Sequence, residues 1–147
     1  MKGKYSFITL FLMLISFSSM AEEFGKITIT IEGIKNTKGT IKLALAYNEK
    51  KFNSVNLIKK AFRVESLKIS ARPLNFTFDK IPYGTYALSV FHDENDNNDL
   101  DRDLFDAPLE GYGYSNNPKK MERAATFKES QFEFKSNLHK LTIKLNN

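Results

Sequence analysis

The sequence predicts an all-β fold, a single antiparallel β-sandwich of about seven strands with at most one short helix. Three observations predict it. Apolar and polar side chains alternate through several stretches of the chain, which is the two-residue period of half-buried strands. Turn residues separate these stretches, and only one segment has apolar positions at helical spacing. We expect an immunoglobulin-like or transthyretin-like arrangement in one domain, residues 22–147.

The first 21 residues have the plan of a cleaved secretory signal peptide. Lys2 and Lys4 precede about 13 mostly apolar residues, and Ser19 and Ala21 are small residues at the positions that a signal peptidase inspects. A membrane anchor is the alternative, but a spanning helix needs roughly 20 apolar residues. We therefore expect a periplasmic or secreted protein, cleaved after Ala21 and left without a transmembrane anchor. The chain has no cysteine, so neither disulfides nor a lipid-modified cysteine are available to it.

The charge distribution argues against a nucleic-acid partner. The chain carries 22 Lys and Arg against 17 Asp and Glu, a formal net charge of +5. Its lysines lie in scattered pairs, whereas nucleic acid needs a continuous basic footprint. We expect a monomer, with a glycan or an envelope protein as the kind of partner left open.

The first elements expected are a hairpin and a helix. Residues 26–34 and 40–47 alternate in polarity, and the turn at 36–39 between them predicts a hairpin of half-buried strands. Residues 49–62 break this alternation. Their apolar positions cover about a third of a helical wheel, so a short amphipathic helix is expected there.

The strongest strand is expected at residues 85–92, after a turn at Pro82–Gly84. It is rich in β-branched and aromatic residues and apolar on both faces, as in a central strand. A long polar loop is expected at 93–122, and loops of this length are generally functional or disordered. The remaining strands are expected at residues 64–69, 73–78, 126–134 and 138–145.

The segment HDENDNNDLDRD, residues 92–103, opens the long loop with six carboxylates and three asparagines. Oxygen-bearing side chains fall on alternate positions, so a curled loop can point them at one hard cation. The predicted ligands of a structural Ca²⁺ are Asp93, Asn95, Asn97, Asp99 and Asp101. Asn98 stands where an EF-hand loop has Gly, and Leu104 stands where it has the bidentate Glu. The alternatives are a solvated acidic loop and another metal, and zinc is disfavoured by the absence of cysteine.

Other candidates for chemistry are few. His92 could act as a general base or orient a metal-bound water, or it could be a strand-end histidine bonded to the loop backbone. Tyr112 and Tyr114, between glycines, could stack on a sugar or peptide, or pack back over the loop. Ser115 lacks the strand-to-helix elbow of a hydrolase nucleophile. His139 is expected to be exposed on a closing strand.

The runs IPYGTYALSVFHDENDNNDLD and DAPLEGYGYSNN resemble the bacterial domain-of-unknown-function family 2141. The matching positions are Pro82, Gly84, Thr85, Tyr86, Ala87, His92 to Asn95, Asn97, Leu100, Asp101, Pro108, Glu110, Gly111, Tyr112, Gly113, Ser115 and Asn116. The resemblance covers the chain from about Lys26 to Leu145 and implies an exported single-domain β-sandwich with no established activity. The chain departs from the family at Asn98, where Gly is frequent, and in KKMERAATF, where Gly and Pro are usual.

We therefore expect a non-catalytic binding or structural module of the cell envelope with a calcium-type Asp/Asn loop. The alternative is a metal-assisted envelope enzyme that uses His92 and Asp93. Exposed Tyr112 and Tyr114 beside an ordered loop would favour binding. Convergence of His92, Asp93 and Glu110 on a pocket would favour the enzyme, and buried tyrosines without a cleft would favour a purely structural role.

Overall fold

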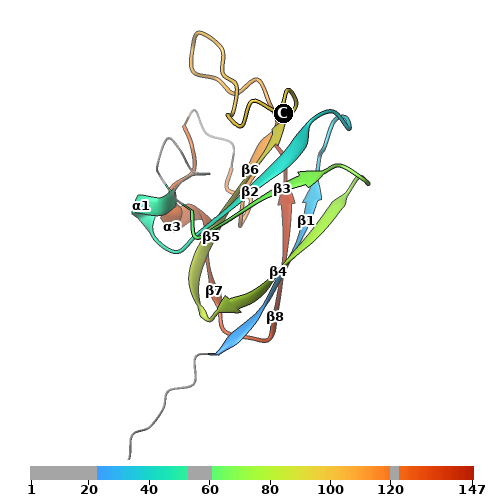
Figure 1. Cartoon of the computed structure of the whole chain (residues 1–147). Helices are drawn as coiled ribbons and strands as arrows, with labels where there is room; N and C mark the ends of the chain where they lie inside the picture. The colour runs from blue at the N-terminus through green and yellow to red at the C-terminus, as the bar shows by residue number, and fades with distance from the viewer. Residues whose placement is uncertain (1–22, 53–60, 120–122) are drawn as a thin grey trace, which may run out of the picture.

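Two β-sheets pack face to face in the computed structural model, which describes residues 23–52, 61–119 and 123–147 (Figure 1). The three-stranded sheet has the order β4 (Leu74–Pro82), β1 (Phe24–Glu32) and β8 (Leu138–Lys144). The other sheet has the order β3 (Arg63–Lys68), β2 (Thr40–Ala46), β5 (Gly84–Asp93) and β6 (Tyr112–Tyr114), and β7 (Gln131–Phe134) also pairs with β5. Over the described residues this arrangement of eight strands confirms the predicted β-sandwich.

The predicted hairpin of the first two strands is wrong. β1 pairs with β4 and β8, whereas β2 pairs with β3 and β5 in the opposite sheet. The physical reason is burial, because residues 41–46 of β2 are buried on both faces and need a sheet covered on both sides. The β1–β8 pair is parallel, in an otherwise antiparallel fold.

β5 is the central strand, as predicted. It pairs with β2 along one edge, and on its other edge Gly84–Ala87 pairs with β7 and Ser89–Phe91 pairs with β6. The turn predicted at Pro82–Gly84 is the crossing between sheets, because β4 ends at Pro82 and β5 begins at Gly84.

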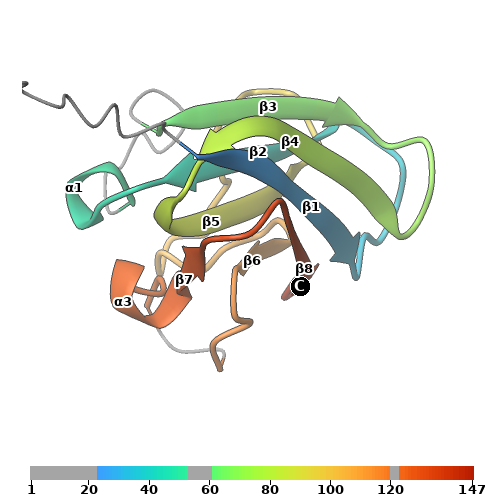
Figure 2. The same cartoon turned by 90° about the horizontal axis from the view of Figure 1, so that it is seen from below.

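Two other expectations change in the structure. Of the helix expected at 49–62, the structure contains α1 (Glu49–Phe52), and residues 53–60 lie outside the described part. The strand expected from residue 126 begins only at Gln131, because Thr126 and Glu129 form a capping box that starts the helix α3 (Phe127–Ser130). α1 and α3 lie together at one side of the sandwich (Figures 1 and 2), where the rings of Phe52 and Phe127 meet edge to face at 5.9 Å.

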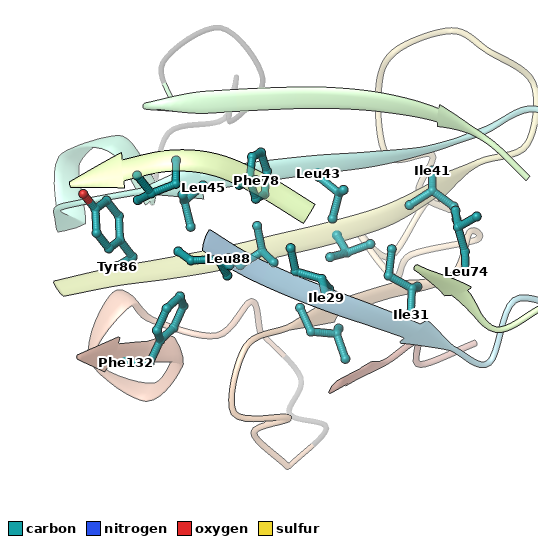
Figure 3. Close-up of a cluster of buried hydrophobic side chains, with 14 of the residues drawn as sticks. Ile29, Ile31, Ile41, Leu43, Leu45, Leu74, Phe78, Tyr86, Leu88 and Phe132 are labelled. Carbon is teal, nitrogen blue, oxygen red and sulfur yellow. The ribbon is translucent and has the colours of Figure 1, made fainter. Parts of the chain in front are cut away.

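The core lies between the sheets. Its fully buried side chains include Ile27, Ile29 and Ile31 of β1, Ile41, Leu43 and Leu45 of β2, and Leu88 of β5. Figure 3 shows side chains of β1, β2 and β5 meeting between the layers, among them Ile29, Ile31, Ile41, Leu43, Leu45 and Leu88. Each contributes about 1.5–3 kcal/mol of apolar burial, which makes the sandwich a rigid base for the loop that leaves the end of β5.

Candidate functional site

The acidic loop, residues 94–110, extends from one end of the sandwich between β5 and β6 (Figure 1). The long loop predicted at 93–122 is therefore interrupted by β6, and its residues 120–122 lie outside the described part. Within the acidic loop, Arg102 and Pro108 form a β-bridge. Side chains from the sandwich fix the loop at both of its ends.

Asp93, the last residue of β5, anchors the beginning of the loop. Its carboxylate is completely buried, and it accepts the backbone N–H of Asn97 at 3.1 Å and of Asn98 at 2.9 Å. The ammonium of Lys42 lies 3.4 Å from the same carboxylate. A buried charge needs such compensation, so Asp93 curls residues 94–98 around itself.

Lys42 is the cation of this cluster. It projects from the middle of β2, and its Nζ also donates to Ser66 Oγ at 2.9 Å and to Asn98 Oδ1 at 2.8 Å. All three donors of the ammonium therefore have partners. The sequence analysis missed this residue, although a lysine inside the apolar run TIKLALA is a signal, because lysines are almost never buried without a counter-charge.

Glu110 joins the two ends of the loop. Its buried carboxylate accepts the N–H of Glu94 at 2.8 Å and the N–H of Asp101 at 3.1 Å. Glu94 is held in turn by the side-chain amide of Asn36, at 2.9 Å, from the connection between β1 and β2. Buried carboxylates thus act here as acceptors for loop backbone, which is a positioning role.

The structure brings three of the five predicted calcium ligands together. The side-chain amides of Asn95 and Asn97 donate to the two carboxylate oxygens of Asp101, at 2.6 and 2.9 Å. Asp93 faces Lys42 instead, and Asp99 accepts the N–H of the next residue at 2.9 Å. Within the described ranges no three Asp, Glu, His or Cys side chains gather in a way that could hold a metal ion.

The local backbone matches the expectation for a tightly curled loop. Asn98 has φ of 66°, the left-handed conformation expected at the position where an EF-hand loop has Gly. The oxygens of Asn95 and Asn97 accept the N–H groups two residues further on, at 3.0 and 2.8 Å. These turns order the loop and leave Asn95, Asn97 and Asp99 exposed to solvent, so their hard oxygens suit Ca²⁺ chemically.

Both histidines are at least partly buried. His92 is buried, its Nε2–H donates to the carbonyl of Lys38 at 2.8 Å, and its Nδ1 lies 4.0 Å from Glu94. His92 is thus a strand-end histidine, as one alternative predicts, but its ring bonds to the connection between β1 and β2 and not to the acidic loop. His139 is half-buried rather than exposed, because its ring stacks on Phe132 at 4.9 Å, and burial lowers its pKa.

Ser115 is a structural residue. It is fully buried, its hydroxyl accepts the N–H of Leu88 at 2.9 Å, and it donates to the carbonyl of Ser130. A cavity of about 270 Å³ lies elsewhere in the described part of the chain, lined by Glu32, Gly33, Ile34, Arg72 and Pro73. None of the candidate residues lines it.

Tyr112 and Tyr114 are both half-buried on one face of β6. Their rings meet at 6.0 Å, and Tyr114 also contacts Phe52 of α1 at 5.8 Å. Burial, followed by the neighbouring Tyr112, raises the pKa of Tyr114. Gly113 faces the core, where a Cβ would approach Ile143 to 2.8 Å. Tyr114 thus packs onto α1, and neither tyrosine is fully exposed.

The comparisons with known proteins give one match. Residues 29–142 match the model of a family described as an uncharacterized protein conserved in bacteria (DUF2141). No curated protein and no solved structure matches the chain. Among the described residues, no helix has the length and apolar character that a membrane span requires.

Proposed function

The chain belongs to the uncharacterised bacterial family DUF2141, and we propose that it is a non-catalytic binding or structural module of the cell envelope. The observation that supports this proposal most directly is that the polar groups a catalyst would use hold backbone of the acidic loop and of the connection between β1 and β2. His92, Asp93 and Glu110 are each buried and bonded to backbone or to Lys42. Side chains buried and bonded in this way are poorly placed to contact a substrate.

The proposed location is the periplasm or the exterior of the cell. Its support is the N-terminal sequence, in which a short basic segment and an apolar run precede Ser19 and Ala21. Fractionation of a bacterium that carries the gene tests it, together with mass spectrometry of the purified chain. We expect a mature N-terminus at Glu22 in the periplasmic or secreted fraction. A full-length chain in the cytoplasm would overturn the location.

The acidic loop is proposed to bind one structural Ca²⁺ through the oxygens of Asn95, Asn97, Asp99 and Asp101. The support is chemical, because these donors are all hard oxygens, and Ca²⁺ completes its six to eight ligands with backbone carbonyls and water. Asp93 is proposed to anchor the loop and not to bind the ion, because Lys42 and two backbone amides already compensate its carboxylate.

Thermal melts in EDTA and in millimolar Ca²⁺ separate these roles. Extracellular calcium modules bind at about 10⁻⁴–10⁻³ M, and a ligand at 10 times its dissociation constant stabilises by about 1.4 kcal/mol. Asp101→Asn should abolish the response to Ca²⁺ and lower the midpoint in EDTA by less than Asp93→Asn does, because the amide bonds it loses lie at the exposed side of the loop. Asp93→Asn should lower the midpoint in both buffers and keep the response. A wild-type midpoint that ignores Ca²⁺ would reject the calcium site.

A further inference from the structure

We propose that the tip of the acidic loop, residues 102–109, docks into an apolar pocket bordered by basic side chains on a second protein. This proposal rests on the binding role proposed above, but not on export or on Ca²⁺. Leu104 is 100% exposed, Phe105 is 91% exposed and Leu109 is 65% exposed. Elsewhere in the described residues, no large apolar side chain is more than 49% exposed. The most exposed apolar surface is thus concentrated in one short segment.

The exposure comes from an ordered turn. The carboxylate of Asp103 accepts the N–H of Phe105 at 2.8 Å and of Ala107 at 3.0 Å, and the N–H of Asp103 donates to the Ala107 carbonyl at 2.9 Å. Asp106 takes a left-handed conformation with φ of 64° and donates to the Asp103 carbonyl at 3.1 Å. Leu104 and Phe105 are therefore held outward by the backbone that carries them.

The base of the tip is closed as well. Arg102 donates to the carbonyl of Asp106 at 2.7 Å and lies 3.7 Å from its carboxylate, while Leu109 donates to the carbonyl of Asp101 at 2.8 Å. A turn held by this many bonds loses little further conformational freedom when it binds. Polar residues would satisfy a turn at this place without exposing apolar surface, so an apolar pair here indicates contact with another molecule.

The charge around the tip selects the kind of partner. Residues 96–109 contain five Asp and one Arg, a local charge of −4 in a chain whose net charge is +5. With the proposed Ca²⁺ bound this charge is −4 + 2 = −2, so the segment is acidic in either state. Apolar anchors within a charged rim are the usual anatomy of a protein interface. Carboxylates on the rim favour a pocket bordered by Lys and Arg. The same carboxylates repel anionic phospholipids and nucleic acid, so a protein pocket fits this surface better than a membrane does.

Site-specific photo-crosslinking in a bacterium that carries the gene tests the proposal. The full chain with p-benzoylphenylalanine at position 105 should give one discrete covalent adduct with another protein. The matched control carries the same group at Phe24, an exposed aromatic 47% accessible at the start of β1, and should not give that adduct. No protein adduct, an adduct shared with position 24, or an adduct with a second copy of the chain would overturn the proposal.

The adduct is then tested with the purified partner. Phe105→Ser should raise the dissociation constant by about 30-fold, the effect of removing an interface anchor. The thermal midpoint should stay unchanged, because the side chain touches little of its own chain. Association should slow as NaCl rises, since the rim attracts a basic surface. Docking to a protein would be refuted if Phe105→Ser bound the partner as tightly as the wild type. It would also be refuted if the wild type co-sedimented with phosphatidylglycerol vesicles and Phe105→Ser did not.

Discussion

The buried ion pair between Lys42 and Asp93 should carry a large share of the stability of the acidic loop. Lys42→Met keeps most of the aliphatic stem and removes the ammonium. The two side chains are 8% and 0% exposed, and breaking such a pair by removing one partner costs about 3–5 kcal/mol. Asp93 keeps two N–H donors, from Asn97 and Asn98. We therefore expect the lower end of that range, about 3 kcal/mol.

Lys26→Met is the matched control. Lys26 lies closer to its partner Asp79, at 2.9 Å, but the two side chains are 59% and 62% exposed. Exposed pairs contribute about 0–1 kcal/mol. Lys26→Met should therefore lower the free energy of unfolding less than Lys42→Met does, although its ion pair is the shorter one. If burial decides the contribution, the two lysine variants will differ clearly although each removes one ammonium from one carboxylate.

Urea denaturation followed by circular dichroism measures both costs, since the chain has no tryptophan to serve as a fluorescence probe. Asp93→Asn and the double variant with Lys42→Met complete a cycle. The double variant should cost less than the sum of the single variants by about 1 kcal/mol or more, because it leaves no unpaired charge. Equal costs for Lys42→Met and Lys26→Met, or full additivity in the cycle, would refute the reasoning.

Two further predictions concern backbone space and a lowered pKa. Gly39→Ala should lower the thermal midpoint by an amount equivalent to at least about 2 kcal/mol, because φ is +61° and the new Cβ would lie 1.9 Å from the carbonyl oxygen of Asp93. Gly84→Ala, whose nearest contact is at 3.4 Å, is the control, and similar midpoints for both variants would contradict this prediction. The bidentate hydrogen bonds of Arg123, followed by the hydrogen bonds of Thr126, lower the pKa of Glu129 from 4.5 to about 2, so the stability this carboxylate adds is present above pH 4.5 and is lost as the pH falls toward 2. In Arg123→Ala the pKa read from an NMR titration should rise toward 4.5, and an unchanged value would show that the guanidinium is not the main cause.

A strand could be predicted from the sequence where the polarity pattern of its own residues is sufficient to identify it. β5 and β8 were predicted within two residues, since apolar residues on both faces indicate a central strand and alternation indicates a half-covered one. The pairing of β1 and β2 could not be predicted in the same way. A short turn between alternating strands favours a hairpin locally, and only the burial of both faces of β2 places the two strands in different sheets.

The candidate site was predicted in part. Asp93 is predicted as a calcium ligand and Glu110 as part of a possible pocket, whereas in the structure both carboxylates hold loop backbone and Asp93 also faces Lys42. Lys42 is 51 residues away from Asp93 in the sequence, and only the β2–β5 register brings them together. The capping box at Thr126 and Glu129 was readable from the sequence as a T-x-x-E pattern. A strand is predicted from residue 126 instead, because the polar and apolar residues of the following β7 alternate at the period of a strand.

The parallel pairing of β1 with β8 bears on how the chain reaches its folded state during synthesis. β1 is the middle strand of its sheet, and its partner residues lie far ahead in the sequence, as Lys26 pairs with Leu138. A ribosome makes β1 before β8, so this sheet cannot close until the chain has been made to about residue 138. Contacts of such long sequence separation also form slowly. For a chain exported by an N-terminal signal, as proposed here, this delay is an advantage, because the nascent polypeptide stays open enough to be threaded through a narrow channel.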